Sequence, residues 1–152
     1  MRISLAELNE FNFVKQITQD TINAVYPKYY PAGAVDFFLQ HHTDEKIIDD
    51  IKAGKVYILQ LDNDEYVGTV TVDGNEIKRL FVLPEYQHQG HGRALMDHAE
   101  IVIAQEYREI VLDSSLPAKS IYRKRGYVET EYHIIIADNG DYLCYDEMRK
   151  EV

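Results

Sequence analysis

The feature that most constrains the fold is a polar loop, Gln87–Arg93, that joins an apolar run to a helical pattern. The run Leu80-Phe81-Val82-Leu83 is continuous, which is typical of a strand buried on both faces. After the loop, one helical stripe carries the apolar residues Leu95, Ala99, Val102 and Ile103. The segment therefore predicts a buried strand that leads directly into an amphipathic helix.

The loop has the composition of an anion site. Successive backbone N–H groups at the positive end of a helix dipole favour an anion, and a pyrophosphate is the natural ligand. Gly90 and Gly92 let the backbone approach phosphate oxygens, and Arg93 adds charge-assisted hydrogen bonds. The alternative is a helix-entry turn with no ligand.

Two other phosphate-binding loops do not fit these residues. A P-loop ends in Gly-Lys-Ser/Thr, whereas Gly92 is followed by Arg93 and Ala94. The dinucleotide fingerprint needs a third small residue where this chain has Leu95. Neither an NTPase nor a nicotinamide dehydrogenase is indicated.

Apolar periodicity and turn residues predict the other elements. A strand over 2–8 precedes helical regions over 9–30 and 34–53, with Thr43 as a helix cap inside the second. The apolar face of the first helix is marked by Phe13, Ile17, Thr21 and Val25. Then follow strands over 55–61, 66–72 and 76–83, a helix over 93–107, a strand over 109–113, a helix over 117–125, and a hairpin of strands 127–137 and 141–148. This order of strand, two helices, three strands, helix, strand, helix and two strands predicts one α+β domain over 1–152, with a mixed, largely antiparallel sheet flanked by helices.

The charge of the chain limits its partners. Sixteen Lys and Arg against 26 Asp and Glu give a formal net charge of −10, which argues against a nucleic-acid partner and favours cationic or neutral substrates. A late basic cluster, which could meet an anion, consists of Lys119, Arg123, Lys124 and Arg125. The alternative for any such charge run is a solvated helix face.

Location and metal chemistry can also be predicted. No apolar run approaches the roughly 20 residues of a membrane-spanning helix, and residues 1–8 lack the features of a signal peptide, so we expect a cytoplasmic protein without a membrane partner. The single cysteine, Cys144, excludes an internal disulfide and is expected to be a packed thiol. His41 and His42 are adjacent and would point differently from a helix, so no metal is expected.

Two blocks of the sequence resemble a known family. Residues 76–93 resemble the acetyl-CoA loop of the GCN5-related N-acetyltransferase (GNAT) superfamily, Gln/Arg-x-x-Gly-x-Gly/Ala after a strand ending in Val-x-Pro. Residues 112–127 resemble its block Asn-x-x-Ala-x-x-x-Tyr-x-x-x-Gly-Phe, with Ala118, Tyr122 and Gly126 in place. Ser115 stands where Asn is usual and Tyr127 where Phe is usual. The first 55 residues match only in helical character.

The resemblance implies a GNAT-like fold and transfer of acetyl from acetyl-CoA to a primary amine, by direct attack in a ternary complex and without a metal. It implies that the strand backbone at Leu80, Phe81 and Val82 pairs with the pantetheine arm at a bulge. The pyrophosphate would be held by the amides of Gln87, His88, Gln89, Gly90, His91, Gly92 and Arg93. Ser115 would replace the Asn that bonds pantetheine, and Lys119 or Arg123 would reach the 3′-phosphate.

The same resemblance implies two catalytic groups. Glu76 would be the base that deprotonates the ammonium through water, and Tyr122 the acid that protonates the leaving sulfur. For Glu76 the alternative is an exposed strand-end carboxylate, with Asp73 or water alone as the base. For Tyr122 the alternative is an aromatic ring that packs a helix on the sheet.

The sequence leaves several acceptors open. The N-terminal aromatic residues Tyr26, Tyr29, Tyr30 and Phe38 fall where the family forms its acceptor side, and they are expected either to line an amine pocket or to pack in the core. Small cationic amines and basic peptides both suit the acidic chain. An acyl-CoA sensor without turnover is the competing function, and the tyrosine-rich last hairpin is a possible homodimer surface.

Overall fold

The computed structural model describes residues 1–152 and confirms the α+β class. Seven strands form one open sheet in the order β1-β2-β3-β4-β5-β7-β6. The strands are β1 (Arg2–Leu5), β2 (Val56–Gln60), β3 (Tyr66–Asp73), β4 (Glu76–Val82), β5 (Glu109–Ser114), β6 (Val128–Ile136) and β7 (Tyr142–Glu151). The helices are α1 (Phe11–Val25), α2 (Ala32–His41), α3 (Asp44–Lys52), α4 (His91–Ala104) and α5 (Lys119–Lys124), with short 3-10 turns η1 (Leu8–Glu10), η2 (Tyr26–Lys28) and η3 (Pro84–Tyr86).

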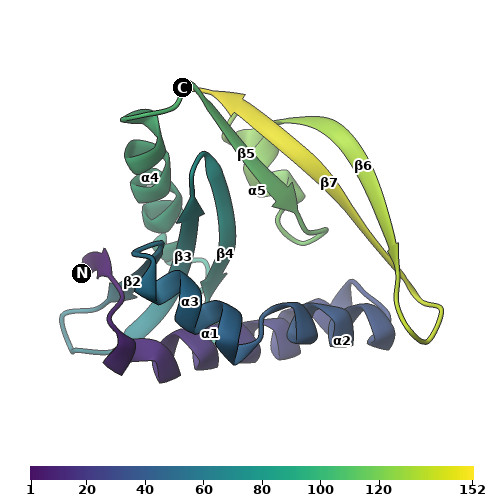
Figure 1. Ribbon diagram of the computed structural model, residues 1–152, viewed down its shortest axis with the longest axis horizontal. Coiled ribbons are helices and arrows are strands. Elements are labelled where there is room, and N and C mark those ends of the chain that lie inside the picture. Colours follow the sequence, from purple (N-terminus) through teal and green to yellow (C-terminus); the bar gives the residue numbers. More distant parts are fainter.

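The sheet divides into two wings at its centre. Every strand pair is antiparallel except β4–β5, and these two strands pair only at Glu76 with Val111 and at Ile77 with Leu112. Beyond Ile77 they diverge, so that β1–β4 form one wing and β5–β7 the other (Figure 1). A register shift between Thr69 and Thr71 marks the bulge that the family resemblance implied in β4.

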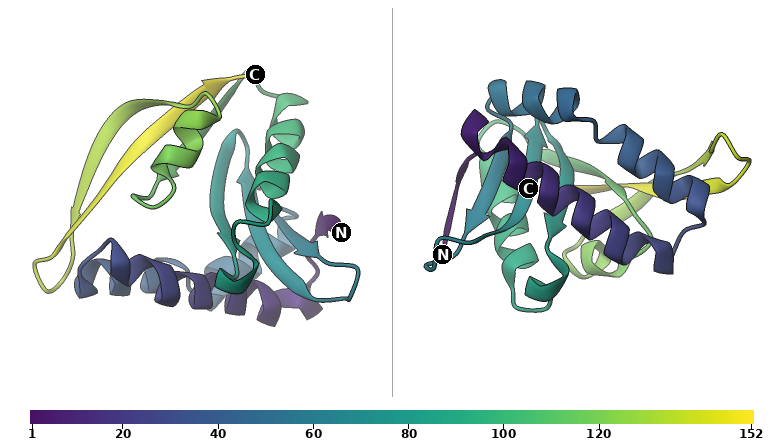
Figure 2. Two further views of the ribbon diagram at one scale, coloured as in Figure 1. Left: turned by 180° about the vertical axis from the view of Figure 1, so that it is seen from behind. Right: turned by 90° about the horizontal axis from the view of Figure 1, so that it is seen from below.

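Helices cover the two faces of the sheet with separate cores. On one face α4 buries Leu95 and Met96 against strand residues such as Leu59 and Ile110. On the other face α1–α3 bury Ile22 and other apolar side chains against β2 (Figure 2). Because successive strand residues point to opposite faces, both cores draw on the same strands.

Two details of the helical prediction were wrong. The region 34–53 is not one helix, because the Thr43 hydroxyl accepts the Lys46 N–H (3.3 Å) and begins α3 as a new helix after α2. Three helices therefore precede β2, rather than two. In α1, Phe13 is 44% exposed, while Val14, Ile17 and Ile22 are buried. A spacing of four residues turns 40° past a full helical turn at each step, so a stripe drawn that way leaves the buried face.

The prediction that residues 80–83 are buried on both faces was also partly wrong. Phe81 and Val82 are buried, but Leu80 and Leu83 are only partly so. The cause is the divergence of β4 from β5, which leaves this end of β4 beside a cavity instead of a neighbouring strand.

The last hairpin reaches back to the N-terminal helices. Its tip meets the start of α2, where the Gly33 N–H donates to Asp141 Oδ2 (2.9 Å). A Cβ on Gly33 would lie 2.0 Å from Asn139 Oδ1, so a side chain at this position would displace the Asn139 side chain from its hydrogen bonds with Asp141. The outer face of the hairpin exposes Tyr132 and Tyr142, and its use as a homodimer surface stays a prediction. No helix has the length and apolar character that a membrane-spanning segment needs.

We expect Gly33→Ala to lower the free energy of unfolding by about 1–3 kcal/mol, because the new methyl group would push the hairpin tip away. The double variant Gly33→Ala/Asn139→Ala should recover most of that loss, because it removes the Asn139 side chain that the new methyl group would meet. Alanine is also a better helix former than glycine, by about 1 kcal/mol. Urea denaturation of both variants measures this. Equal losses in the single and double variants would show that the contact with Asn139 is not the cause.

Candidate active site

A cavity of about 820 Å³ lies where the two wings separate. One side is formed by β4 and by the N-terminal helices, including Tyr26 and Phe38, and the other by β5, α5 and β7, including Ser115 and Tyr122. Tyr26 belongs to the core on one face of the sheet and Tyr122 to the core on the other. The cavity therefore connects the two faces of the sheet through the gap between β4 and β5.

The glycine-containing loop lies at this cavity with its amides free. No backbone acceptor takes the N–H groups of residues 88–93, and the first backbone hydrogen bond of α4 is from Ala94 N–H to Gly90 O (3.0 Å). Gly90 has a φ of +90°, in the left-handed region that favours glycine, and His88 also has a positive φ of +61°. Gly92 lines the cavity. The loop therefore presents a row of unpaired donors at a helix N-terminus, as an anion site requires.

Gln87 lines the cavity as predicted, but its backbone N–H is not free. Its backbone N–H already donates to Pro84 O (3.3 Å), and its side chain donates to Val82 O (2.9 Å). The side chain thus ties the loop to the end of β4, and the free amides begin at His88.

The predicted thioester strand lines the same cavity. Leu80, Phe81 and Val82 all contribute to its wall. Because β4 and β5 no longer pair here, the edge of β4 that faces β5 has backbone groups open to a ligand in the gap.

Tyr122 points its ring into the cavity from α5. It is buried and packs edge-on against Tyr127, with ring centroids 5.8 Å apart. Burial raises the pKa of Tyr122 well above its usual value, and the nearby Tyr26 adds to the shift. The hydroxyl is therefore protonated at neutral pH and can serve as a proton donor.

Glu76 lies at the start of β4 and also lines the cavity. Its Oε2 is 3.1 Å from Lys78 Nζ. Asp113 of β5 lies close by, and burial, together with the negative charges of Glu76 and Glu147, raises the pKa of Asp113. Asp73, the alternative base, forms ion pairs with Lys55 and Lys78 and is not part of the cavity wall.

The residues after β5 that were predicted to contact the cofactor do not all lie at the cavity. Ser115 lines the cavity, whereas Lys119 does not. The Lys119 Nζ lies 2.6 Å from an Asp146 carboxylate oxygen and 3.4 Å from one of Glu129, and Arg123 also pairs with Glu129. A phosphate contact from Lys119 or Arg123 stays a prediction that needs these ion pairs to rearrange.

The predicted aromatic pocket is only partly assembled. Tyr26 and Phe38 line the cavity with their rings in edge-to-face contact at 4.6 Å. Tyr30 is buried behind Phe38, with centroids 5.2 Å apart, and it does not line the cavity. Tyr29 is 50% exposed and lies outside the wall.

A buried ion pair in the cavity wall was not predicted from the sequence. The Arg79 guanidinium pairs with Asp50 of α3 and donates to Thr71 Oγ1 (3.2 Å). Burial lowers the pKa of Arg79 to about 10 and that of the neighbouring His42 to about 3, the latter with help from the charge of Arg79. The signal that could have identified Arg79 was its place directly before the apolar run Leu80–Val82 of β4.

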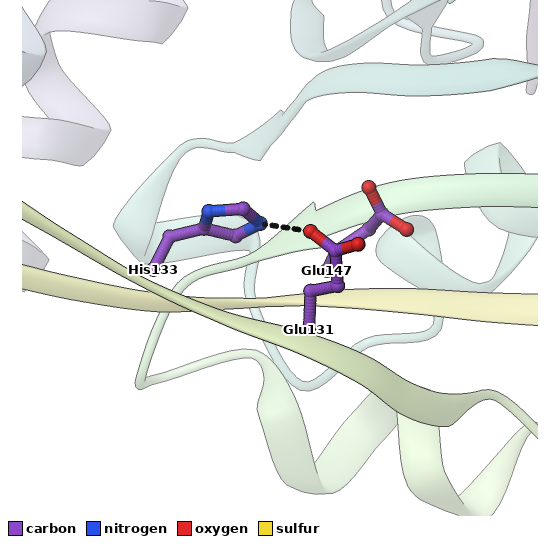
Figure 3. A group of neighbouring side chains, drawn as sticks. All are labelled: Glu131, His133 and Glu147. Carbon is purple, nitrogen blue, oxygen red and sulfur yellow. Dashed lines mark ion pairs between the residues drawn. The ribbon is translucent and has the colours of Figure 1, made fainter.

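A second polar cluster lies outside the cavity wall, on β6 and β7. Figure 3 shows Glu131, His133 and Glu147 pointing toward one another, with His133 Nε2 3.3 Å from Glu131 Oε2. Glu147 also accepts from Arg149 Nε (2.8 Å) and from Thr130 Oγ1 (3.0 Å). Its charge is therefore already partly compensated by the protein.

Comparisons with known proteins identify the family. Residues 25–151 match the family described as the acetyltransferase (GNAT) domain. Over 87 residues the chain is 28% identical to the peptidyl-lysine N-acetyltransferase YjaB of Salmonella typhimurium, an alignment that spans 57% of this chain and 59% of that protein.

Solved structures show the same fold. A GCN5-related N-acetyltransferase of Rhodopseudomonas palustris superimposes with a TM-score of 0.88 at 21% identity, covering 99% of this chain and 95% of that one. The PaiA N-acetyltransferase of Thermoplasma acidophilum, solved with coenzyme A, gives a TM-score of 0.73 at 16% identity, with 99% and 98% covered. The divided sheet, the free amides before α4 and the family match agree, and the chain belongs to the acetyltransferase (GNAT) domain family.

Proposed function

We propose that this protein transfers the acetyl group of acetyl-CoA to a primary amine, by direct attack in a ternary complex. One observation carries the proposal: the loop of free amides, at His88 and Gly92, the unpaired end of β4 and the protonated Tyr122 all border one cavity. Its volume of about 820 Å³ is in the range of ligand sites. The residues present therefore fit a coenzyme A arm, with the pyrophosphate at the amides and the pantetheine between the wings.

The chain's own groups can perform each proton transfer. Glu76 accepts a proton from the acceptor ammonium through water, so that the amine nitrogen can attack the thioester carbon. An N–H of β4 donates to the thioester oxygen as it gains charge, a contact worth about 3 kcal/mol in related acyl transfers. Tyr122 donates its hydroxyl proton to the sulfur as the carbon–sulfur bond breaks, and the tyrosinate takes back, through water, the second proton that the attacking nitrogen loses. The products are an amide and a free thiol, with the first proton left on Glu76.

The polar groups beyond Glu76 support a cationic acceptor. Asp113 lies opposite Glu147 in the β5–β7 register, and Glu147 lies opposite Glu131 in the β6–β7 register. Together with Glu76 these carboxylates extend from the cavity across β4, β5, β7 and β6 on neighbouring strands. Glu76, Glu131 and Glu147 pair with Lys78, His133 and Arg149, so Asp113 is the carboxylate of this row that is left for an amine with further positive charge. The relative named as a peptidyl-lysine N-acetyltransferase acts on such a basic side chain.

The test is thiol release from acetyl-CoA across polyamines, aminoglycosides, amino acids and lysine-containing peptides. We expect turnover with cationic amines and none with acidic amino acids. Turnover with a lysine-containing peptide alone would identify a protein-modifying enzyme. Tight binding of acetyl-CoA without turnover of any acceptor would contradict the proposal in favour of a sensor.

Asp113→Asn should stabilise the protein at pH 7 and weaken acceptor binding. The raised pKa of Asp113 means that the folded state disfavours the ionised carboxylate. Ionised Asp113 therefore lowers the free energy of unfolding at pH values above its folded-state pKa, and this effect disappears as the carboxyl is protonated. We expect a gain of at most about 1 kcal/mol at pH 7, because the Asp113 side chain is only partly desolvated in the cavity wall and keeps an exposed side where solvent screens its charge. The gain should vanish near pH 3, where the carboxyl is neutral.

Thermal unfolding at both pH values and KM for the best cationic amine measure these effects. Asp20→Asn removes the same charge from an exposed position on α1 and is the control. An unchanged KM in Asp113→Asn would remove this carboxylate from the acceptor site.

A further inference from the structure

The β5–α5 segment carries two residues of the proposed site but is weakly tied to the opposite wing. Beyond the two residue pairs at 76–77 and 111–112, no ladder joins β4 to β5. Tyr122 lies on α5, a helix of six residues that is too short to be stable alone. The ladder with β7 extends to Ser114, so the sheet holds β5 within its own wing but does not set the distance between the turn after Ser114 and the opposite wing.

Two tyrosines after α1 make that connection across the gap. The Tyr30 hydroxyl accepts the Leu116 N–H at 2.7 Å. The Tyr26 hydroxyl meets the Ser115 side chain, and this contact opposes the rise in the pKa of Tyr26 that burial causes. Both rings are buried and lie 5.6 Å apart between their centroids. The two tyrosines after α1 thus contact the β5–β7 wing at neighbouring residues of one turn, 115–116.

Hydrogen bonds continue from this turn to Tyr122. The Ser115 carbonyl accepts the N–H groups of Ala118 (3.1 Å) and Lys119 (3.2 Å), which begins α5. The Ala118 carbonyl accepts the Tyr122 N–H at 3.2 Å. Moving Ser115 would therefore move the start of α5 and, with it, the Tyr122 hydroxyl.

We propose that Tyr26 and Tyr30 are positioning residues, whose hydroxyls hold the 115–116 turn and so set the gap between the wings that receives the pantetheine arm. The inference rests on the proposed function, because the gap matters only if that arm lies in it. Tyr30 does not border the cavity, so it acts entirely through Leu116. Tyr26 borders the cavity and also contacts Phe81 of β4, with centroids 6.3 Å apart, so it joins both walls of the gap.

The test compares two probes with the variants Tyr30→Phe and Tyr26→Phe/Tyr30→Phe. Coenzyme A occupies both the amides before α4 and the gap, whereas 3′-phosphoadenosine 5′-diphosphate lacks the pantetheine arm. We expect the double variant to bind coenzyme A about tenfold more weakly, as the loss of the Tyr30–Leu116 hydrogen bond and of the Tyr26 contact with Ser115 implies, and to bind the shorter probe as the wild type does. Tyr30→Phe should show a smaller effect in the same direction.

Tyr66→Phe is the matched control, because it removes a tyrosine hydrogen bond, to Glu10 (2.6 Å), outside the cavity wall. It should leave the affinity for both probes unchanged. Equal coenzyme A affinity in the wild type and the double variant would overturn the inference and leave the proposed function intact. Equal loss of both probes would overturn it too, since that pattern indicates general destabilisation. A wild type that binds neither probe would overturn the proposed function itself.

Discussion

Gly92→Val is expected to reduce acetyl-CoA affinity by at least 100-fold while the protein remains folded. A Cβ at this position would meet only Val82 Cγ2, at 3.8 Å, so the protein itself has room for a side chain there. Gly92 nevertheless borders the cavity beside the free amides, so a branched side chain would occupy the approach of the phosphate oxygens.

Calorimetric titration of the variant measures this loss, and thermal unfolding confirms that it is folded. Ala104→Val is the control, because it places the same branched side chain at the exposed far end of α4. It should bind acetyl-CoA like the wild type. A loss of less than tenfold in Gly92→Val would show that the phosphate does not lie at these amides.

Tyr122→Phe is expected to lower kcat by about 10² to 10⁴-fold, the contribution that a positioned acid typically makes. The acetyl-CoA affinity should change little, because the aromatic ring and its packing on Tyr127 are retained. The effect should be much smaller with an acetyl thioester of a more acidic thiol, since such a sulfur leaves without protonation.

Tyr127→Phe is the matched control for this prediction. Tyr127 is a neighbouring buried tyrosine whose hydroxyl donates to Glu100 Oε1 (3.2 Å) and which does not border the cavity. Its loss should lower stability and leave kcat nearly unchanged. An unaltered kcat in Tyr122→Phe would assign that ring to packing alone.

The parts of the fold that depend on local chemistry were predictable. The strand before Pro84, the loop around Gly90 and the helix after it follow from periodicity and turn residues within a short stretch of sequence. The break at Thr43 was also visible as a cap, although the region was expected to be one helix. A cap inside a helical pattern indicates two helices when the loop between them can be short.

The parts that depend on distant contacts were not predictable. Arg79 and Asp50 are 29 residues apart and meet only because the fold brings both to the wall of the same cavity. The family motif indicated Tyr122, but nothing in it could show that Tyr26 and Tyr30 reach the turn before α5. Tyr26, Tyr29 and Tyr30 are close in sequence, and only the turn after α1 decides which are buried.

The divergence of β4 and β5, together with the amides before α4, forms the proposed acetyl-CoA site. Isothermal titration of the wild-type protein with acetyl-CoA is the first experiment to make. We expect one-to-one binding in the micromolar range or tighter, and its loss in Gly92→Val. Absence of measurable heat with a folded wild-type protein, or undiminished binding by Gly92→Val, would contradict the proposed site.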